Sequence, residues 1–183
     1  MKQILRNFAS KVADCSVEIY NEFSLQHELG IHLRSIFPSM KVQFERNVSF
    51  FFSNSNLKFI KKEIDISIFS ANKDQKEVAL ELKFPRNGQY PEQMFSFCKD
   101  ICFVEQLKKA GFRSAYFIVF ADDRLFYEGS TDKIYGFFRG GKELHGNIQK
   151  PTGKKNESVS INGSYSISWF PVSQGMKYTL VEI

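Results

Sequence analysis

The sequence predicts an α/β fold, a mixed β-sheet with flanking helices, and three patterns in it predict this class. Apolar residues recur at steps of three and four near the N-terminus and again between residues 92 and 111, as in amphipathic helices. Segments of alternating apolar and polar residues lie between these helices and indicate strands. A nearly all-apolar segment, residues 114–121, then follows, which is typical of a strand buried on both faces and reached by a helical crossover.

Two helices are expected before the sheet. The apolar stripe of the first helix is Leu5, Phe8, Val12, Cys15 and Ile19. The second helix is expected over residues 24–37, with Ser24 as its N-cap, and it ends before Pro38 because the residue before a proline disfavours the helical conformation. Glu28 and His32 lie beside the apolar stripe of this second helix.

The segments that follow are read as strands and one long helix. Residues 40–45 and 48–52 are expected as strands, followed by the strands that contain Asp65 and Glu81. A helix starts near Glu92 and stops at Gly111, and residues 159–170 and 176–183 form an antiparallel ending. The 183 residues therefore form a single domain, with a core at about 24–121 and a C-terminal antiparallel β extension at about 122–183.

The two strands that contain Asp65 and Glu81 carry charged residues at positions where burial of charge is costly. Alternation places Ile64, Ile66 and Ile68 on one face of the first strand, and Val78, Leu80, Leu82 and Phe84 on one face of the second. Asp65, Glu81 and Lys83 have the opposite parity. If these strands are neighbours, two carboxylates and one ammonium group project from the same side of the sheet.

This combination resembles the PD-(D/E)XK nuclease superfamily, in which an acidic residue on one strand is followed by Glu-x-Lys on the next. The resemblance covers about residues 24–121 and implies a restriction-endonuclease-like αβββαβ core. Asp65 matches the first acidic position, Glu81 the second and Lys83 the lysine, whereas Ile64 stands where the name of the family expects proline.

The resemblance also implies further site residues. Glu28 matches the glutamate that some members place on the helix before the sheet, and Leu82 would offer its main-chain carbonyl to a metal. Among the polar residues of the later helix, Lys99, Asp100 and Gln106, we select Gln106 as the additional catalytic residue.

These residue types suit hydrolysis of phosphodiesters. Carboxylates bind hard cations such as Mg²⁺ or Mn²⁺, which polarise a phosphate and lower the pKa of bound water. We therefore expect Asp65, Glu81, Leu82 and Glu28 to hold the metal, and Lys83 to orient the water or stabilise the transition state. The expected activity is that of a Mg²⁺-dependent DNA endonuclease; the alternative is a non-catalytic nucleic-acid-binding or protein-interaction module on the same fold.

Composition sets the remaining expectations. The net charge of +5 and pI near 9.0 favour a polyanionic partner, with DNA favoured over RNA, and double-strand cutting by a domain of this size would favour a homodimer. Candidate phosphate contacts are Lys58, Lys61, Lys62, Lys150, Lys154 and Lys155, and Phe84 and Tyr90 are candidates for base stacking. The three cysteines form no metal or disulfide pattern, and no signal peptide or membrane span is visible, so a cytoplasmic protein without membrane association is expected.

Overall fold

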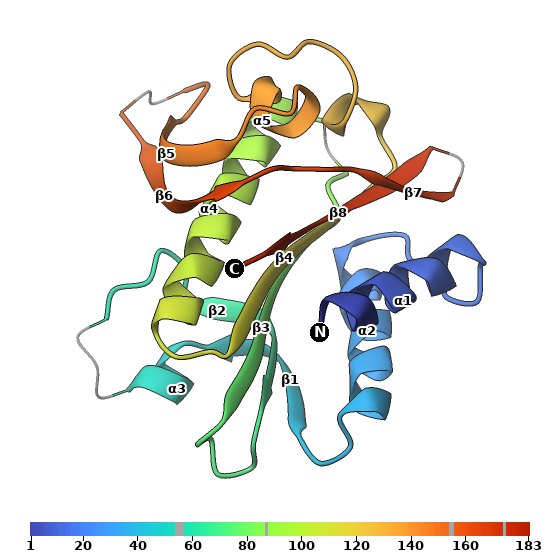
Figure 1. Cartoon of the computed structure of the whole chain (residues 1–183), viewed down its shortest axis with the longest axis vertical. Coiled ribbons are helices and arrows are strands. Elements are labelled where there is room, and N and C mark those ends of the chain that lie inside the picture. The colour runs from blue at the N-terminus through green and yellow to red at the C-terminus, as the bar shows by residue number, and fades with distance from the viewer. Residues whose placement is uncertain (54–56, 87, 154–155, 174) are drawn as a thin grey trace.

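The structure, a computed structural model, describes residues 1–53, 57–86, 88–153, 156–173 and 175–183. Its centre is a mixed sheet of six strands in the order β1-β2-β3-β4-β8-β7 (Figure 1). Only the β3–β4 pair is parallel among the pairings of this sheet in the described residues. The strands are β1 Lys41–Asn47, β2 Glu63–Phe69, β3 Lys76–Lys83, β4 Ser114–Ala121, β7 Phe170–Ser173 and β8 Met176–Glu182. The predicted mixed α/β class is therefore confirmed.

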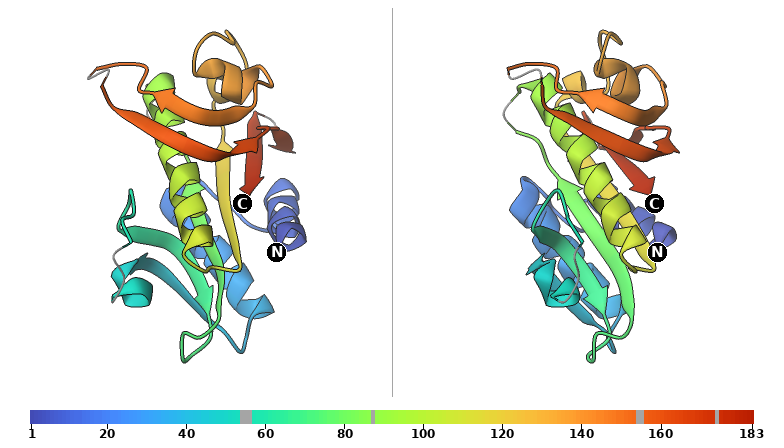
Figure 2. Two further views of the ribbon diagram at one scale, coloured as in Figure 1. Left: turned by 60° about the vertical axis from the view of Figure 1, so that its left-hand side comes forward. Right: turned by 90° about the vertical axis from the view of Figure 1, so that its left-hand side faces the viewer.

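Helices cover both faces of this sheet (Figures 1 and 2). The helices α1 (Lys2–Ala13) and α2 (Glu22–Ile36) pack on one face, and α4 (Tyr90–Lys109) packs on the other. The helix α4 links β3 to the parallel strand β4, which confirms the predicted crossover. None of the helices in the described part of the chain combines the length and apolarity that a membrane span requires.

The two N-terminal helices have other bounds than the sequence predicts. The first ends at Ala13 instead of reaching Ile19, because the chain reverses at Cys15, which has a φ of 62°. The second begins at Glu22, and its N-cap is Asn21 instead of Ser24. Asn21 and Ser24 form a capping box, in which each side chain accepts a hydrogen bond from the backbone of the other residue.

The prediction of a strand at residues 48–52 is wrong. The segment forms a short helix, α3 (Ser49–Phe52). Just before it, Asn47 Oδ1 accepts a hydrogen bond from the backbone N–H of Ser49 at 3.0 Å. Aromatic contacts hold it in place, with the Phe51 ring 5.0 Å from Phe69 and 5.2 Å from Phe112 between centroids. The elements from α2 to β4 therefore run helix, strand, short helix, two strands, helix, strand.

The expected C-terminal extension is divided between two sheets. The strands β5 (Leu144–Gln149) and β6 (Ser158–Tyr165) form a separate antiparallel pair that packs on α4 (Figure 2). The strand predicted at 159–170 is thus broken, since β6 ends at Tyr165 and β7 starts a new strand at Phe170. The strands β7 and β8 extend the main sheet beside β4. Between β4 and β5 lie a 3₁₀ turn, Arg124–Phe126, and the short helix α5 (Tyr135–Arg139).

Candidate active site

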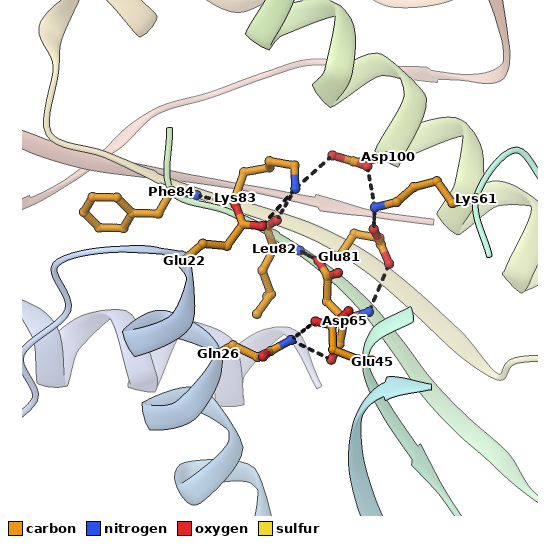
Figure 3. A network of polar contacts seen from close by, with 10 residues as sticks. All are labelled: Glu22, Gln26, Glu45, Lys61, Asp65, Glu81, Leu82, Lys83, Phe84 and Asp100. Carbon is orange, nitrogen blue, oxygen red and sulfur yellow. Dashed lines mark hydrogen bonds and ion pairs between the residues drawn. The ribbon is translucent and has the colours of Figure 1, made fainter. Parts of the chain in front are cut away.

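The candidate site begins where β2 and β3 stop pairing. Their regular pairing ends at Ile66 and Leu80, and the next residue toward the open end of each strand is acidic, Asp65 on β2 and Glu81 on β3. The Asp65 N–H donates to Glu81 Oε1 at 3.2 Å, and the Leu82 N–H donates to Asp65 Oδ2 at 2.7 Å. The structure therefore brings the two predicted carboxylates together, wedged between the strands and fixed by backbone donors (Figure 3). We call this place the fork.

The face assignment made from alternation holds with one exception. Most of the apolar residues predicted to share a face of β2 and β3 do so, and this face packs under α1 and α2. Ile64, predicted to share the face of Ile66 and Ile68, instead belongs to the core on the α4 side. It lies on the open side of the fork, where β2 no longer pairs with β3.

Both carboxylates at the fork are buried. Asp65 is 9% exposed and Glu81 is fully buried. Burial raises the pKa of Asp65 to about 6, against the opposing effect of Lys61 and Lys83. Burial raises the pKa of Glu81 well above its usual range, and the neighbouring Asp65 carboxylate raises it further. Two buried carboxylates side by side favour a cation between or beside them.

Lys61 supplies one such positive charge. Its ammonium group forms an ion pair with Glu81 Oε2 and lies 2.8 Å from Asp100 Oδ1 (Figure 3). Burial acts to lower the pKa of Lys61, but Glu81 and Asp100 outweigh it and raise that pKa. The chain thus compensates its own buried carboxylates with a lysine from the segment just before β2.

Lys83 occupies the other side of Asp100. Its ammonium group lies 3.1 Å from Glu22 Oε1, 3.1 Å from the Leu82 carbonyl oxygen and 3.7 Å from Asp100 Oδ2. Burial acts to lower the pKa of Lys83, and the nearby carboxylates of Asp100 and Glu22 reverse this and raise it. Lys83 is therefore held as a cation beside the fork.

Asp100, on α4, is the site residue that the sequence analysis named but did not select. It is 1% exposed, and its Oδ2 has no hydrogen-bond partner among the described residues. Gln106, the predicted choice, lies outside this network: its Oε1 accepts the N–H of Ile60 at 2.8 Å. Gln106 thus holds the backbone next to Lys61. Among the described interactions, its side chain makes no contact with Asp65, Glu81 or Lys83, the residues of its predicted catalytic site.

Glu22 takes the position on α2 that the sequence analysis gave to Glu28. Its Oε2 also accepts the N–H of Phe84 at 3.3 Å. Gln26, one turn later on the same helix face, donates to the Asp65 carbonyl at 3.0 Å and to Glu45 Oε1 at 2.5 Å. Glu28 follows Gln26 by two residues, a step that places its side chain on the opposite face of the helix. Its Oε1 lies 3.4 Å from His27 Nδ1.

An open cavity of about 340 Å³ lies against the Asp65 side of the fork. Its lining comes from α2 and from the edges of the three neighbouring strands. The lining residues are Glu22, Phe23, Gln26, Glu45, Asp65 and Leu82. The cavity therefore reaches Asp65 from the α2 side, and three of its six lining residues are acidic.

The carboxylate and carbonyl oxygens at the fork are of the type that hard divalent cations bind. In the described ranges, no three His, Cys, Asp or Glu side chains are grouped as a metal site. Mg²⁺, however, is commonly bound by one or two carboxylates together with water and substrate phosphates. Asp65, Glu81 and the Leu82 carbonyl provide such oxygens. Asp100 lies nearby, and its buried Oδ2 has no hydrogen bond among the described residues but lies 3.7 Å from the Lys83 ammonium group.

Other residues noted in the sequence have structural contacts. Phe84 is buried, and Tyr90 packs on Phe126 and donates its hydroxyl to Asp123 Oδ2 at 2.6 Å. Lys150 pairs with Glu157 at 2.9 Å, whereas Lys154 and Lys155 lie outside the described residues. Phe84 therefore packs in the core, whereas Tyr90 is half-buried, and a base-stacking role for these two residues stays a prediction.

Comparison of the chain with protein-family models, with curated protein sequences and with solved structures found no match in any of the three.

Proposed function

We propose that this chain is a divalent-metal-dependent nuclease that hydrolyses phosphodiester bonds in DNA, with its active site at the fork. One observation carries the proposal: Asp65 and Glu81 are buried side by side where the strands separate, with Lys83 and an open cavity beside them. Buried charge of this kind is costly to folding, and such cost is common at functional sites. The resemblance to PD-(D/E)XK nucleases supports the same reading.

Each residue has a role in this proposal. Asp65, Glu81 and the Leu82 carbonyl would hold Mg²⁺ or Mn²⁺, which when bound neutralises phosphate charge and lowers the pKa of water. Lys83 orients the attacking water or stabilises the negative charge that develops on the phosphate. Glu22 and Asp100 hold the Lys83 ammonium group in place, at 3.1 Å and 3.7 Å.

A second function is favoured by a different observation. Lys61 already pairs with Glu81, so the fork has an internal cation in the absence of metal. On this view the chain is a non-catalytic nucleic-acid-binding or protein-interaction module whose buried charges are structural. The net charge of +5 is compatible with both functions.

The two functions are separated by a cleavage assay. The purified protein is incubated with supercoiled plasmid, single-stranded DNA and RNA, each with Mg²⁺, with Mn²⁺ and with EDTA. We expect metal-dependent cleavage of DNA that falls about 100-fold or more in both Glu81→Gln and Lys83→Met, because the first loses a metal ligand and the second loses the positive charge beside the phosphate.

Glu77→Gln is the matched control. Glu77 lies on the same strand, and its described ion pair is with Arg113, far along the strand from the fork. Its variant should cleave at the wild-type rate. Cleavage that persists in Glu81→Gln would refute the site, and binding of DNA without cleavage by the wild type would establish the binding module instead.

Further features of the proposal concern its setting. Cleavage of both strands of a duplex by a chain of this size would use a homodimer. All three cysteines are free in the structure, which is compatible with action in a reducing compartment such as the cytoplasm.

A further inference from the structure

Two aromatic side chains are exposed at the start of α2, next to the fork. Phe23 is 82% exposed and Tyr20 is 62% exposed, the highest exposures among the large hydrophobic residues identified as exposed. The backbone here is rigidly held, because the capping box fixes Asn21 and Ser24. Glu22, the neighbour of Phe23, is tied to Lys83 and to the Phe84 N–H. An exposed aromatic ring on a fixed backbone loses little further entropy when it binds a partner.

Phe23 lies between two cavities of different charge. On one side is the cavity that reaches Asp65. On the other is a second open cavity of about 330 Å³, which Lys83 and Arg86 line together with Glu22 and Phe23. Glu22 and Phe23 are the residues common to both cavities. The ring therefore stands between the proposed metal site and a cavity that carries two cationic side chains. Lys83 is paired with Glu22 and Asp100, and Arg86 forms a partly exposed ion pair with Asp122, from which a phosphate can draw it.

This arrangement matches a single polynucleotide strand. A strand with one phosphate at the fork can place a neighbouring phosphate near Lys83 and Arg86, and its path then passes the Phe23 ring. In a duplex each base face is covered by the adjacent bases, so a side chain beside the backbone meets only sugar and base edges. An unpaired base offers a free face, on which aromatic side chains stack.

We propose that Phe23 is a stacking platform for an unpaired base, which makes single-stranded nucleic acid the substrate class of this site. The inference rests on the proposed nuclease function for the identity of the fork. The cationic side chains in the adjoining cavity favour a polyanion over an apolar protein segment as the partner of the ring.

Binding of short probes tests the proposal. Fluorescein-labelled (dT)₁₂ and a 12-base-pair duplex are titrated with protein in Ca²⁺, and a denaturing gel verifies that the probes stay intact. Phe23→Ala should weaken binding of (dT)₁₂ roughly 5- to 100-fold, the loss expected for one base–aromatic stack, and leave duplex binding unchanged. The slope of log affinity against log salt should not change, since no phosphate contact is removed.

Two matched variants separate stacking from general effects. Phe23→Trp keeps an aromatic face and should bind (dT)₁₂ within about twofold of wild type. Ile31→Ala removes an exposed apolar side chain from the same helix, away from both cavities, and should have no effect. Equal losses for (dT)₁₂ and duplex, or no loss in Phe23→Ala, would overturn the proposal.

A competing occupant of the ring is a second copy of this chain. If Phe23→Ala converts a dimer to a monomer in analytical ultracentrifugation and leaves (dT)₁₂ binding intact, the stacking proposal is overturned. The two proposals can fail separately. If the protein cleaves nothing in Mg²⁺ but its binding of (dT)₁₂ still depends on Phe23, the nuclease function is refuted and the stacking site is supported.

Discussion

Lys61 is the residue that most affects how a metal ion could enter the fork. Its ammonium group is paired with Glu81 and Asp100, so a divalent cation at Glu81 must displace it or bind against its repulsion. The charge balance of the site therefore depends on a lysine from the loop before β2 as much as on the Glu-x-Lys pair.

Replacement of this lysine should tighten metal binding. In Lys61→Met the competing charge is absent, and we expect the Kd for Mn²⁺, measured by isothermal titration calorimetry, to fall about tenfold. The metal-free variant should unfold at a lower temperature, because Glu81 and Asp100 lose their counter-charge. Lys62→Met is the control, since Lys62 is exposed and adjacent in sequence. Unchanged or weaker Mn²⁺ binding in Lys61→Met would contradict competition.

At the residue scale, alternation along the strands was enough to group Asp65, Glu81 and Lys83. Asp100 could not be chosen over Gln106 in the same way, because α4 is buried around most of its circumference and the apolar pattern favours no single face. The sequence pattern does not point to Glu22, because an N-cap at Ser24 starts the predicted helix too late to include this residue. Asn21 with Ser24 three residues later is a capping pattern that the sequence contains.

At the element scale, one buried carboxylate joins α4 to the second sheet. Glu105 is 8% exposed, and its oxygens accept hydrogen bonds from the Asn162 N–H, the Gly163 N–H and the Tyr165 hydroxyl at 3.0, 2.6 and 2.9 Å. It also accepts from the Asn162 side-chain amide at 3.1 Å. Burial, with the contact to Glu105, raises the pKa of the Tyr165 hydroxyl. The strand β6 is therefore attached to α4 by a charge-assisted network as well as by apolar packing.

Loss of this carboxylate should destabilise the fold. Glu105→Ala leaves several backbone and side-chain donors without their acceptor, and we expect the free energy of unfolding to fall by about 2–3 kcal/mol in urea titrations. Lys109→Ala, an exposed change near the end of the same helix, should stay within about 0.5 kcal/mol of wild type. A Glu105→Ala protein as stable as wild type would show that the network contributes no net stability.

The elements that sequence patterns located best were those with long, regular periodicity. The helix α4 and the strands β2, β3 and β4 fall close to their predicted positions. In segment 48–52 the consecutive phenylalanines favour a strand by propensity, but contacts with Phe69 and Phe112 hold the segment in a helical turn. Tertiary packing decided this element, and no local pattern reports it.

At the scale of the whole molecule, the C-terminal residues belong to the sheet that carries the site. The strand β8 pairs antiparallel with β4, and Val181 and Tyr178 are buried in the cores on the two faces of the sheet. The predicted core at 24–121 is thus incomplete as a sheet without β8. Pairing between strands distant in sequence follows from three-dimensional packing, which a single sequence does not reveal.

At the fork the strands β2 and β3 separate. The helices on the two faces of the sheet each place a carboxylate, Glu22 and Asp100, beside Lys83, and Lys61 from the preceding loop balances the charge of Glu81. We expect this arrangement to hold a divalent cation. The most direct measurement is Mn²⁺ binding to the intact chain by electron paramagnetic resonance, for wild type, Asp65→Asn and the control Glu77→Gln. We predict a saturable Mn²⁺ site that Asp65→Asn weakens at least about tenfold and Glu77→Gln leaves unchanged. Absence of a saturable site in the wild type, or a site equally strong in Asp65→Asn, would show that the fork does not bind a divalent cation.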